Sequence, residues 1–423
     1  MSTTSTKEWP TRRLKFAATI NDEALSEDTD PDYEFQYLDI GNVDSLGNIN
    51  EVASYRFENA PSRARRRVTD GDVIISTVRT YLQAIASIEN PPENLIVSTG
   101  FAVVRPRDNV LNPRFCKYAL RDPAFLAEVG MRSVGVNYPA INASEIGDIH
   151  VHLPPLPRQT HIAAFLDRET SRLDALVAAK QTLIDLLAEK RRALITRAVT
   201  RGLNPDVPLN YSGLSWLGSV PVHWKIKRLK HISPFITVGV VVNPTSYVTN
   251  EGVPFLFGSD VTEEGIDISN ARQIPPEVSR GELAKTCLHP GDIVTVRVGY
   301  PGVTAVVPQE LEGANCASMM LARGDPSFDS KWLAHVMNSR VGRYQFEVVQ
   351  YGAAQEQFNI GHAVDFQFPV PPLPEQRRIV THIETETARL DALRAEAKRT
   401  IELLKERRSA LIAAAVTGEL EVN

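Results

Sequence analysis

A cluster of arginines is the first group of residues in this sequence whose type and spacing could do chemistry. The segment SRARRRVTDGD contains four of them within five residues: Arg63, Arg65, Arg66 and Arg67. Arg79 and Tyr81 follow at turn distance in STVRTYLQA. Guanidinium groups anchor DNA phosphates and grip guanine edges, while amide side chains grip adenine edges. The cluster therefore suits DNA binding, although a solvated protein surface would have the same composition.

Further candidates for DNA contact lie in two irregular segments, RSVGVNYPAIN and QYGAAQEQFNI, and two more, Arg297 and Tyr300, lie earlier in the second variable part. Gly135 and Gly352 in these segments are 217 residues apart. The two segments share the position of this glycine but differ in their polar side chains. This is expected for two domains of one fold that recognise different ligands. For any single residue of the second copy, an ordinary surface role is the favoured interpretation. The candidates are Arg132, Asn137, Tyr138, Arg297, Tyr300, Gln355, Gln357 and Asn359.

Sequence motifs for catalysis are missing. There is no phosphate-binding G-x-x-x-x-G-K-[ST] loop, no dinucleotide-binding G-x-G-x-x-G and no zinc-binding H-E-x-x-H. The segment NPPE is similar to the base-stacking loop of adenine methyltransferases, but Glu93 replaces its aromatic residue, so we interpret it as a turn. A nucleophile triad assembled by the fold stays open. Buried, unpaired thiols are expected for the isolated cysteines Cys116, Cys287 and Cys316.

Composition and charge describe an ordinary globular chain of 423 residues, 43% hydrophobic and 23% charged. The net charge of -5 argues weakly against a general polyanion binder, but it says nothing about a local patch. No apolar stretch approaches the roughly 20 residues that span a bilayer. The N-terminal segment also lacks the apolar core of a signal peptide. These features predict a cytoplasmic protein with no membrane partner.

An internal repeat organises the chain. The segment PPLPRQTHI, at residues 154–162, recurs as PPLPEQRRI at 371–379, and residues 154–203 align with 371–420 without a gap at an offset of 217. The similarity extends upstream, where DGDVIISTV is similar to PGDIVTVRV. The chain is therefore a tandem duplication of a variable part followed by a helical part.

The helical parts have a coiled-coil pattern, with charged residues at most outer positions. Some 40 residues without glycine or internal proline give each a length of roughly 60 Å, and a helix of that length needs a partner. The linker after the first helix is rich in turn residues and starts the second variable part at the far end, so we predict antiparallel pairing within the chain, with intermolecular pairing as the alternative. The predicted pairing residues are Leu166, Leu173, Leu176, Leu183, Leu187, Leu194, Ile383, Leu390, Leu393, Leu404 and Leu411.

The variable parts are predicted to be α/β domains, because short strand-like runs alternate with Gly, Pro and Asn/Asp turns. Asn112 with Pro113, and Asp329 with Ser330, are predicted helix starts. The predicted fold is mixed α/β, with two globular domains separated by two long antiparallel helices and pseudo-twofold symmetry. The predicted segments are a first domain at 1–153, a helix at 154–201, a linker and second domain at 202–370, and a helix at 371–423.

The sequence resembles a type I restriction-modification specificity subunit over essentially its full length. The resemblance rests on PPLPRQTHI and PPLPEQRRI, on the T-x-RLDAL, ALI and VT motifs that follow each, and on the linker GLNPDVPLNYSGLSWLGSVPVHWKIKRLK. It implies two target-recognition domains that each read one half of a split DNA target, and helices that set the distance between the halves.

The resemblance also implies the partners. Two methyltransferase subunits would dock on the helices, and motor-nuclease subunits would join them. The chain itself would bind double-stranded DNA without catalysis or metal, while S-adenosylmethionine, ATP and magnesium would belong to the partner subunits. Because the two domains differ in polar side chains, the target is expected to be bipartite and asymmetric. The alternative is a coiled-coil scaffold without DNA specificity.

Overall fold

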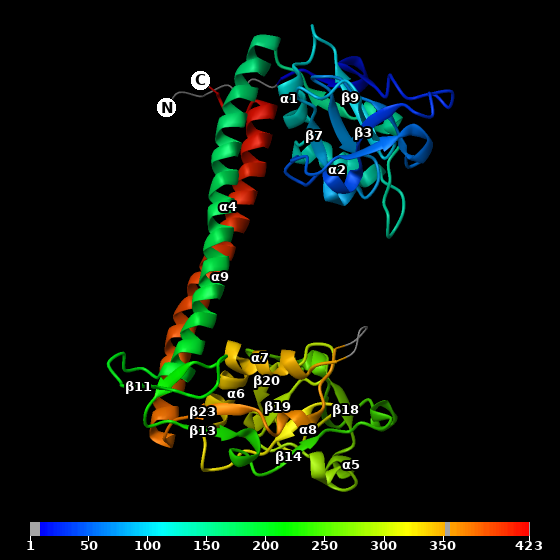
Figure 1. The fold of residues 1–423 in the computed structure, drawn as a ribbon. Coiled ribbons are helices and arrows are strands. Elements are labelled where there is room, and N and C mark those ends of the chain that lie inside the picture. Colours follow the sequence, from blue (N-terminus) through cyan, green and yellow to red (C-terminus); the bar gives the residue numbers. More distant parts are fainter. Residues whose placement is uncertain (1–8, 352–355, 423) are drawn as a thin grey trace, which may run out of the picture. The chain divides into compact units, whose positions relative to one another are not determined.

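The computed structural model describes residues 9–351 and 356–422 (Figure 1). The chain divides into two compact units: unit 1 comprises Met1–Gln181 and Lys398–Asn423, and unit 2 comprises Thr182–Ala397. Each unit therefore contains part of both long helices, α4 (Leu156–Arg201) and α9 (Leu373–Thr417). The four segments predicted along the chain stay a prediction, because the compact units are bounded within the helices.

Unit 1 contains two β-sheets that pack against each other. The first has the order β2 (Ala18–Ile20), β9 (Phe101–Pro106), β6 (Val73–Ser76), β7 (Ile85–Ser87), all antiparallel. The second has the order β4 (Ala53–Arg56), β3 (Glu34–Leu38), β8 (Leu95–Ser98), β5 (Ala64–Arg67), with β3 and β8 parallel. A separate pair joins β1 (Thr11–Arg13) to β10 (His150–His152).

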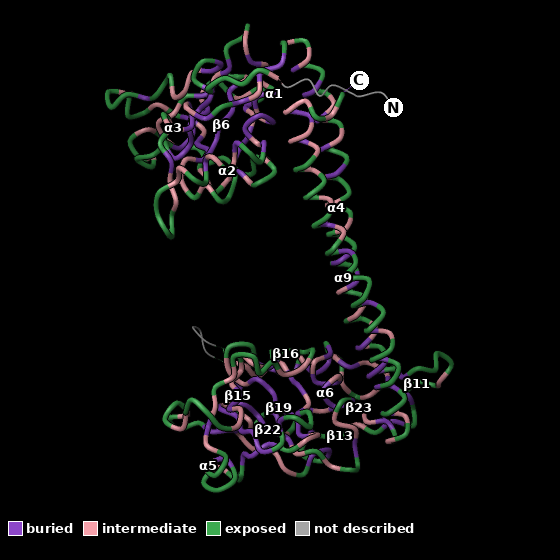
Figure 2. Tube along the Cα trace, turned by 180° about the vertical axis from the view of Figure 1, so that it is seen from behind, coloured by how far each residue is buried: buried purple, intermediate pink, exposed green. Residues whose placement is uncertain are grey.

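The apolar run of β6 is buried on both faces because the strand lies between two layers (Figure 2). Successive side chains of a strand point to opposite faces. Val73 and Ile75 accordingly belong to the core that includes Phe115 of α1 (Pro113–Ala119), whereas Ile74 packs with Val97 of the second sheet. This explains why the strand reads as a continuous apolar run and not as an alternating one.

The remaining helices of unit 1 are α2 (Pro123–Arg132) and α3 (Ala143–Gly147). The predicted start of α1 is confirmed, since the Asn112 side chain accepts a hydrogen bond of 3.1 Å from the Phe115 amide. Pro113 follows at the first helical position, where a missing N–H costs nothing. Cys116 on this helix is buried and free, as are Cys287 and Cys316 of unit 2.

Unit 2 repeats this plan. Its first sheet has the order β14 (Ile236–Val238), β22 (Met320–Ala322), β19 (Ile293–Thr295), β20 (Thr304–Val306), and its second β18 (Arg272–Ile274), β15 (Val253–Leu256), β21 (Asn315–Cys316). Shorter pairs join β11 (Leu209–Tyr211) to β12 (Ser219–Pro221), β13 (Lys225–Arg228) to β23 (Gln367–Val370), and β16 (Val261–Thr262) to β17 (Gly265–Ile266). The short helices are α5 (Pro276–Arg280), α6 (Ser330–Asn338), α7 (Arg340–Val349) and α8 (Ile360–Ala363).

The second predicted helix start is also confirmed, because the Asp329 side chain accepts from the Trp332 amide at 3.0 Å. The segment that starts there forms two helices, α6 and α7, and not one continuous helix. The break lies at Ser339, whose extended ψ of 164° ends α6 and begins α7. Asn338 stabilises the break, because its side chain bonds to the backbone N–H and C=O of Thr304 at 2.9 and 2.7 Å.

A buried ion pair recurs at the start of each central strand. Asp72 precedes β6 and accepts two hydrogen bonds of 2.9 Å from the Arg105 guanidinium. Asp292 precedes β19 and pairs with Arg323, while both aspartates are at most 2% exposed. Buried carboxylates persist only when they are paired. The GD dipeptide of both repeats is therefore structural, and these two arginines belong to the framework.

The two long helices are antiparallel in each unit. In unit 1, Arg408 of α9 bonds to Asp174 of α4 at 3.0 Å. In unit 2, Arg191 of α4 lies 3.7 Å from Asp391 of α9. The aspartates are 217 residues apart, and so are the arginines, so one ion pair of the repeat occurs once in each unit. The predicted antiparallel pairing is confirmed within both units.

The seam between the helices differs from the predicted one at its second heptad position. Leu166, Leu173, Leu187, Ile383 and Leu390 are buried as predicted, and Leu194, Leu404 and Leu411 are half-buried. In contrast, Leu176 (44%), Leu183 (39%) and Leu393 (51%) are exposed.

The reason is the direction of the heptad step. The seam residue that follows Leu173 is Val177, four residues later, and the next at this heptad position is the buried Ile184. The prediction had instead used a spacing of three residues, which leads to Leu176. The second position is occupied by Thr170, Val177, Ile184 and Arg191, of which two are polar and none is leucine. The prediction followed the leucines and therefore placed the second seam position one residue too early.

A glutamine in each PPLP motif joins helix and domain. Gln159 is fully buried, accepts from the Asn112 amide at 2.7 Å and donates to the Pro154 carbonyl at 2.8 Å. In unit 2, Gln376 accepts from the Asp329 amide at 2.8 Å and donates to the Pro371 carbonyl at 2.9 Å. One side chain thus ties the start of each long helix to the cap of the helix beside it.

Candidate nucleic-acid interface

The arginine cluster of unit 1 lies on β5, at the edge of the second sheet. The Arg65 guanidinium lies 4.7 Å from the centre of the Phe57 ring, and the Arg67 guanidinium lies 6.0 Å from that of Tyr33. Stacking on a ring leaves the N–H edge of a guanidinium free to bind phosphate. Arg63 is exposed at the end of the strand. The cluster is a positioned cationic strand, which a solvated loop would not provide.

Arg66 differs from its neighbours. Burial lowers its pKa, and its Nε is buried with no hydrogen-bond partner among the described residues. Strand geometry alternates side chains between faces, and β5 also has a bulge between Ala64 and Arg66. The three adjacent arginines, Arg65, Arg66 and Arg67, therefore do not form one uniform surface.

Arg79 and Tyr138, 59 residues apart in sequence, meet in one surface. The Arg79 guanidinium lies 5.1 Å from the centre of the Tyr138 ring, and both side chains are exposed. The loop of Arg79 is bonded to residues 133–141 through Ile141 N to Thr77 O at 2.8 Å, and Thr80 bonds to Ser133 at 2.9 Å. Tyr81 and Asn137 are exposed in the same two loops.

The loop of Arg79 and the loop of residues 133–141 together form what we call the composite loop. Hydrogen bonds hold its backbone in place. Val134 and Ala140 exchange backbone hydrogen bonds of 2.8 and 3.0 Å, which close a short turn around Gly135. Gly135 has a φ of +117°, a conformation that other residues rarely adopt. Arg79 itself is left-handed, with φ 50° and ψ 48°. Such strained positions persist when the surroundings fix them, and they concentrate at functional sites.

Unit 2 has the same pairing of loops. Tyr351 and Gln357 exchange backbone hydrogen bonds of 2.8 and 2.9 Å, and Phe358 donates to the Arg297 carbonyl at 3.3 Å. Tyr300 is 80% exposed in the loop that corresponds to the Arg79 loop. Arg297 is half-buried and donates to the Ser318 carbonyl at 3.3 Å. Gln355 lies outside the described residues.

A family model of the type I restriction modification DNA specificity domain matches residues 7–185. Residues 7–185 are therefore a type I DNA specificity domain. The match includes the arginine strand and both parts of the Arg79–Tyr138 loop surface, so the resemblance seen in the sequence is confirmed. The framework of this specificity domain recurs in unit 2 through the internal repeat.

Named type I specificity subunits are similar over most of the chain. The MjaX protein of Methanocaldococcus jannaschii is 24% identical over 85% of this chain and 80% of its own length. The EcoBI specificity subunit of Escherichia coli is 23% identical over 78% of this chain and 70% of its own length.

Solved structures show the same fold. A chain from a structural study of assembly and conformational transition of the type I R-M system matches with a TM-score of 0.77 at 23% identity and covers 98% of both chains. The HsdS subunit from Thermoanaerobacter tengcongensis matches with a TM-score of 0.55 at 21% identity, covering 98% of this chain and 97% of its own. The predicted mixed α/β fold is confirmed.

Two predicted contact residues of the specificity domain and its repeat have structural partners. Arg132 forms an ion pair of 2.9 Å with Glu128, one turn earlier on α2. Asn359 accepts from the Gly361 amide at 2.8 Å and so caps α8. Both stay candidates for DNA contact, but these bonds already explain why an arginine and an asparagine occur there.

Apolar residues on the tip of the composite loop were not among the predicted contacts. Val134 is 79% exposed and Val136 is 98% exposed, beside Tyr138. Apolar side chains can contact the methyl group of thymine in the major groove. The sequence offered one signal for them: two β-branched residues flank a glycine in an otherwise polar segment. A segment of this composition is not expected to form a buried strand.

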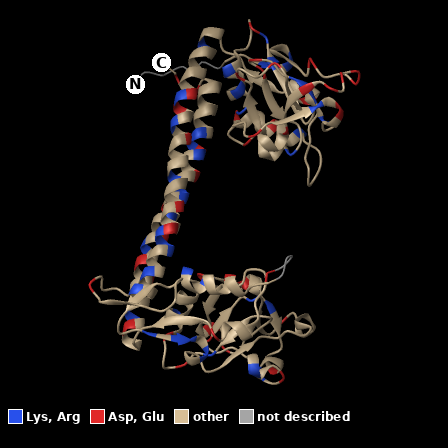
Figure 3. Cartoon of the chain, in the orientation of Figure 1, with Lys and Arg blue, Asp and Glu red and all other residues tan. Residues whose placement is uncertain are grey.

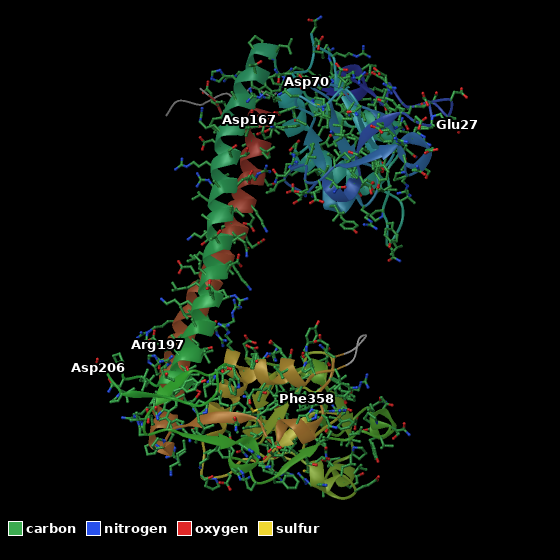
Figure 4. The ribbon with its side chains drawn as sticks, in the orientation of Figure 1. Glu27, Asp70, Asp167, Arg197, Asp206 and Phe358 are labelled. Atoms are coloured by element: carbon green, nitrogen blue, oxygen red, sulfur yellow. The ribbon has the colours of Figure 1, made fainter. Side chains whose placement is uncertain are left out.

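Acidic residues gather elsewhere in unit 1. The segment 22–33 forms a projecting loop, on which Figure 4 labels Glu27, and Figure 3 colours the acidic residues of the chain red. Among the described residues, no three His, Cys, Asp or Glu side chains are placed to hold a metal ion. Within the same residues, no helix is long and apolar enough to cross a membrane.

Proposed function

We propose that this chain is the DNA-specificity subunit of a type I restriction-modification complex, in which each unit reads one half of a bipartite target. The observation that carries the proposal is the pair of bonded loops that recurs in both units and presents exposed polar and aromatic side chains. Family membership of residues 7–185 supports the same role.

The two halves of the target should differ, because equivalent loop positions carry different side chains. Alignment of GDVIISTVRTYL with GDIVTVRVGYPG places Gly299 opposite Arg79 and Tyr300 opposite Thr80. Arg79 can reach a guanine edge, which glycine cannot do. Two domains that share a fold but differ in their contact residues are therefore expected to recognise two different half-sites, which makes the target asymmetric.

The long helices are proposed to set the distance between the half-sites and to dock two methyltransferase subunits. Five leucines exposed outside the seam are the apolar side chains that docked subunits could contact. They are Leu176, Leu183 and Leu186 on α4 and Leu393 and Leu403 on α9. Motor-nuclease subunits would complete the complex, and S-adenosylmethionine, ATP and magnesium would bind to the partner subunits and not to this chain.

Mapping of modified adenines tests the proposal. The chain is co-expressed with the methyltransferase encoded beside it, and methylation is located genome-wide. We expect a split, asymmetric target with a spacer of a few base pairs. A continuous palindromic target would contradict the two-reader mechanism. Absence of sequence-selective, salt-sensitive DNA binding by the purified chain would instead favour the coiled-coil scaffold.

A further inference from the structure

Unit 2 contains a cavity of about 820 Å³ that is rich in arginine. It lies between the last turns of α4 and the break between α6 and α7. The arginines that line it are Arg191, Arg192, Arg197, Arg340 and Arg343. Figure 4 labels Arg197 on its helix. No lysine lines this cavity among the described residues.

Most of these charges are not neutralised inside the protein. Arg191 lies 3.7 Å from Asp391, and Arg343 donates to the Pro301 carbonyl at 3.0 Å. Arg192, Arg197 and Arg340 have no ion pair or side-chain hydrogen bond within the described part of the chain. Three glutamates also line the cavity, but none of them lies within 4.0 Å of an arginine nitrogen in that part. The guanidinium groups are therefore available to an external anion.

The internal repeat shows that the fold does not require these arginines. At the offset of 217, Arg192 corresponds to Ser409, Arg197 to Ala414, Arg340 to Pro123 and Arg343 to Leu126. The equivalent cavity of unit 1 has Leu126, Ser409 and Ile412 in its wall, and the cations that line it are Arg121, Lys405 and Arg408. Of the five arginine positions in the unit 2 cavity, only Arg191 is an arginine in both copies, as Arg408. Positions that are neutral in one copy and cationic in the other point to a ligand of unit 2 alone.

The cavity is joined to the loop proposed to read DNA. Arg343 bonds to Pro301, which is next to Tyr300 in the loop that corresponds to the Arg79 loop. Gly302 of this loop has a φ of +92°, and an added Cβ would meet the Phe346 ring of α7 at 2.6 Å. The loop and the arginine-lined cavity are thus fixed to the same helix.

Resting on the function proposed above, we infer that this cavity binds the phosphate backbone of the duplex that adjoins the half-site read by unit 2. Guanidinium forks bind phosphate oxygens in a bidentate manner, which suits a site made of arginine without lysine. Burial lowers the pKa of His335 in the cavity wall to about 4, so near neutral pH the positive charge comes from the arginines alone. Such contacts position DNA without reading its sequence.

The test measures how duplex binding by the full-length chain depends on salt. The variant changes Arg192→Ser, Arg197→Ala and Arg340→Gln together, and the first two substitutions introduce the residues of unit 1. The control changes three exposed arginines of α9 that do not line this cavity, Arg394, Arg399 and Arg407, to the same residues. The probes are a duplex with the target mapped by methylation and a scrambled duplex of equal length.

Each lost phosphate contact lowers the slope of log K against log salt by about 0.9. We therefore expect the cavity variant to reduce the slope by about 2 to 3 on both duplexes, with the ratio of the two affinities unchanged. The control should change the slope by less than 1. Equal slopes for the two triple variants would overturn the inference.

Two further outcomes are informative. If the triple variant fails to fold, single Arg192→Ser and Arg197→Ala variants decide, and each should lower the slope by about 1. If the slope is unchanged but binding to the methyltransferase is lost, the cavity docks an acidic protein surface and the DNA inference is wrong. If the wild-type chain binds both probes equally and the slope still falls, the proposed function fails while the phosphate site stands.

Discussion

At the scale of single residues, the arginines of this protein separate by their partners. Arg105 and Arg323 hold buried aspartates and stabilise the domains. Arg65, Arg67 and Arg79 lie over aromatic rings; Arg67 and Arg79 are exposed, while Arg65 is half-buried and donates one hydrogen bond to the Ala64 carbonyl. A guanidinium that is positioned by a ring but not neutralised by a carboxylate is suited to an external anion or a base edge. Sequence spacing alone could not make this distinction.

Arg79 is predicted to read a base in one half-site. The substitution Arg79→Gly keeps the left-handed backbone available, and the repeat already has Gly299 at this position. We expect a loss of about 1 to 3 kcal/mol in discrimination at that half-site, because one bidentate base contact contributes about this amount. Competition binding with duplexes altered in either half-site measures the effect.

The matched comparison is the simultaneous replacement of Arg65, Arg66 and Arg67 by Gln. Because Arg65 and Arg67 of this strand lie over aromatic rings and are candidates for phosphate contact, removal of these charges should weaken binding to all duplexes and reduce its salt dependence. Equal loss at both half-sites after Arg79→Gly would count against Arg79 as a base reader.

At the scale of elements, the sequence predicted what depends on local pattern. The helix starts at Asn112 and Asp329, the antiparallel direction of the long helices and the mixed α/β class follow from caps, turns and repeats, and they are confirmed. The contacts between distant segments could not be predicted in this way. Arg79 meets Tyr138, and Gln159 clamps Asn112, only because the tertiary fold brings these pairs together.

The corrected seam makes a prediction at this scale. Ile184 is 7% exposed and Leu183 is 39% exposed, although the two are adjacent on α4. We expect Ile184→Ala to lower the free energy of unfolding by about 2 to 5 kcal/mol, because it leaves a cavity in the seam. Leu183→Ala should lower it by less than about 1 kcal/mol. Urea unfolding of both variants distinguishes the seams, and the reverse order of destabilisation would restore the original heptad assignment.

At the scale of the whole chain, duplication separates what the fold needs from what the function needs. Features present in both copies, such as the Asp72–Arg105 pair, the buried Gln159 and the seam ion pair, build the framework. Features present in one copy, such as Arg79 and the arginines of the unit 2 cavity, are the candidates for recognition. One chain can therefore carry two specificities without two folds.

The repeat also predicts the behaviour of half a chain. Residues 1–201 contain Asp174 and also Arg191, the counterpart of Arg408. When two copies of this fragment pair their helices antiparallel in the register of the full chain, Asp174 of each copy lies opposite Arg191 of the other, and the same apolar seam is formed. We therefore expect the fragment to be a dimer in light scattering and, co-expressed with its methyltransferase, to direct methylation to a palindromic target made of two copies of the half-site read by unit 1. A monomeric fragment would show that the seam needs residues of the second repeat, and an asymmetric target would contradict the assignment of one reader to each copy.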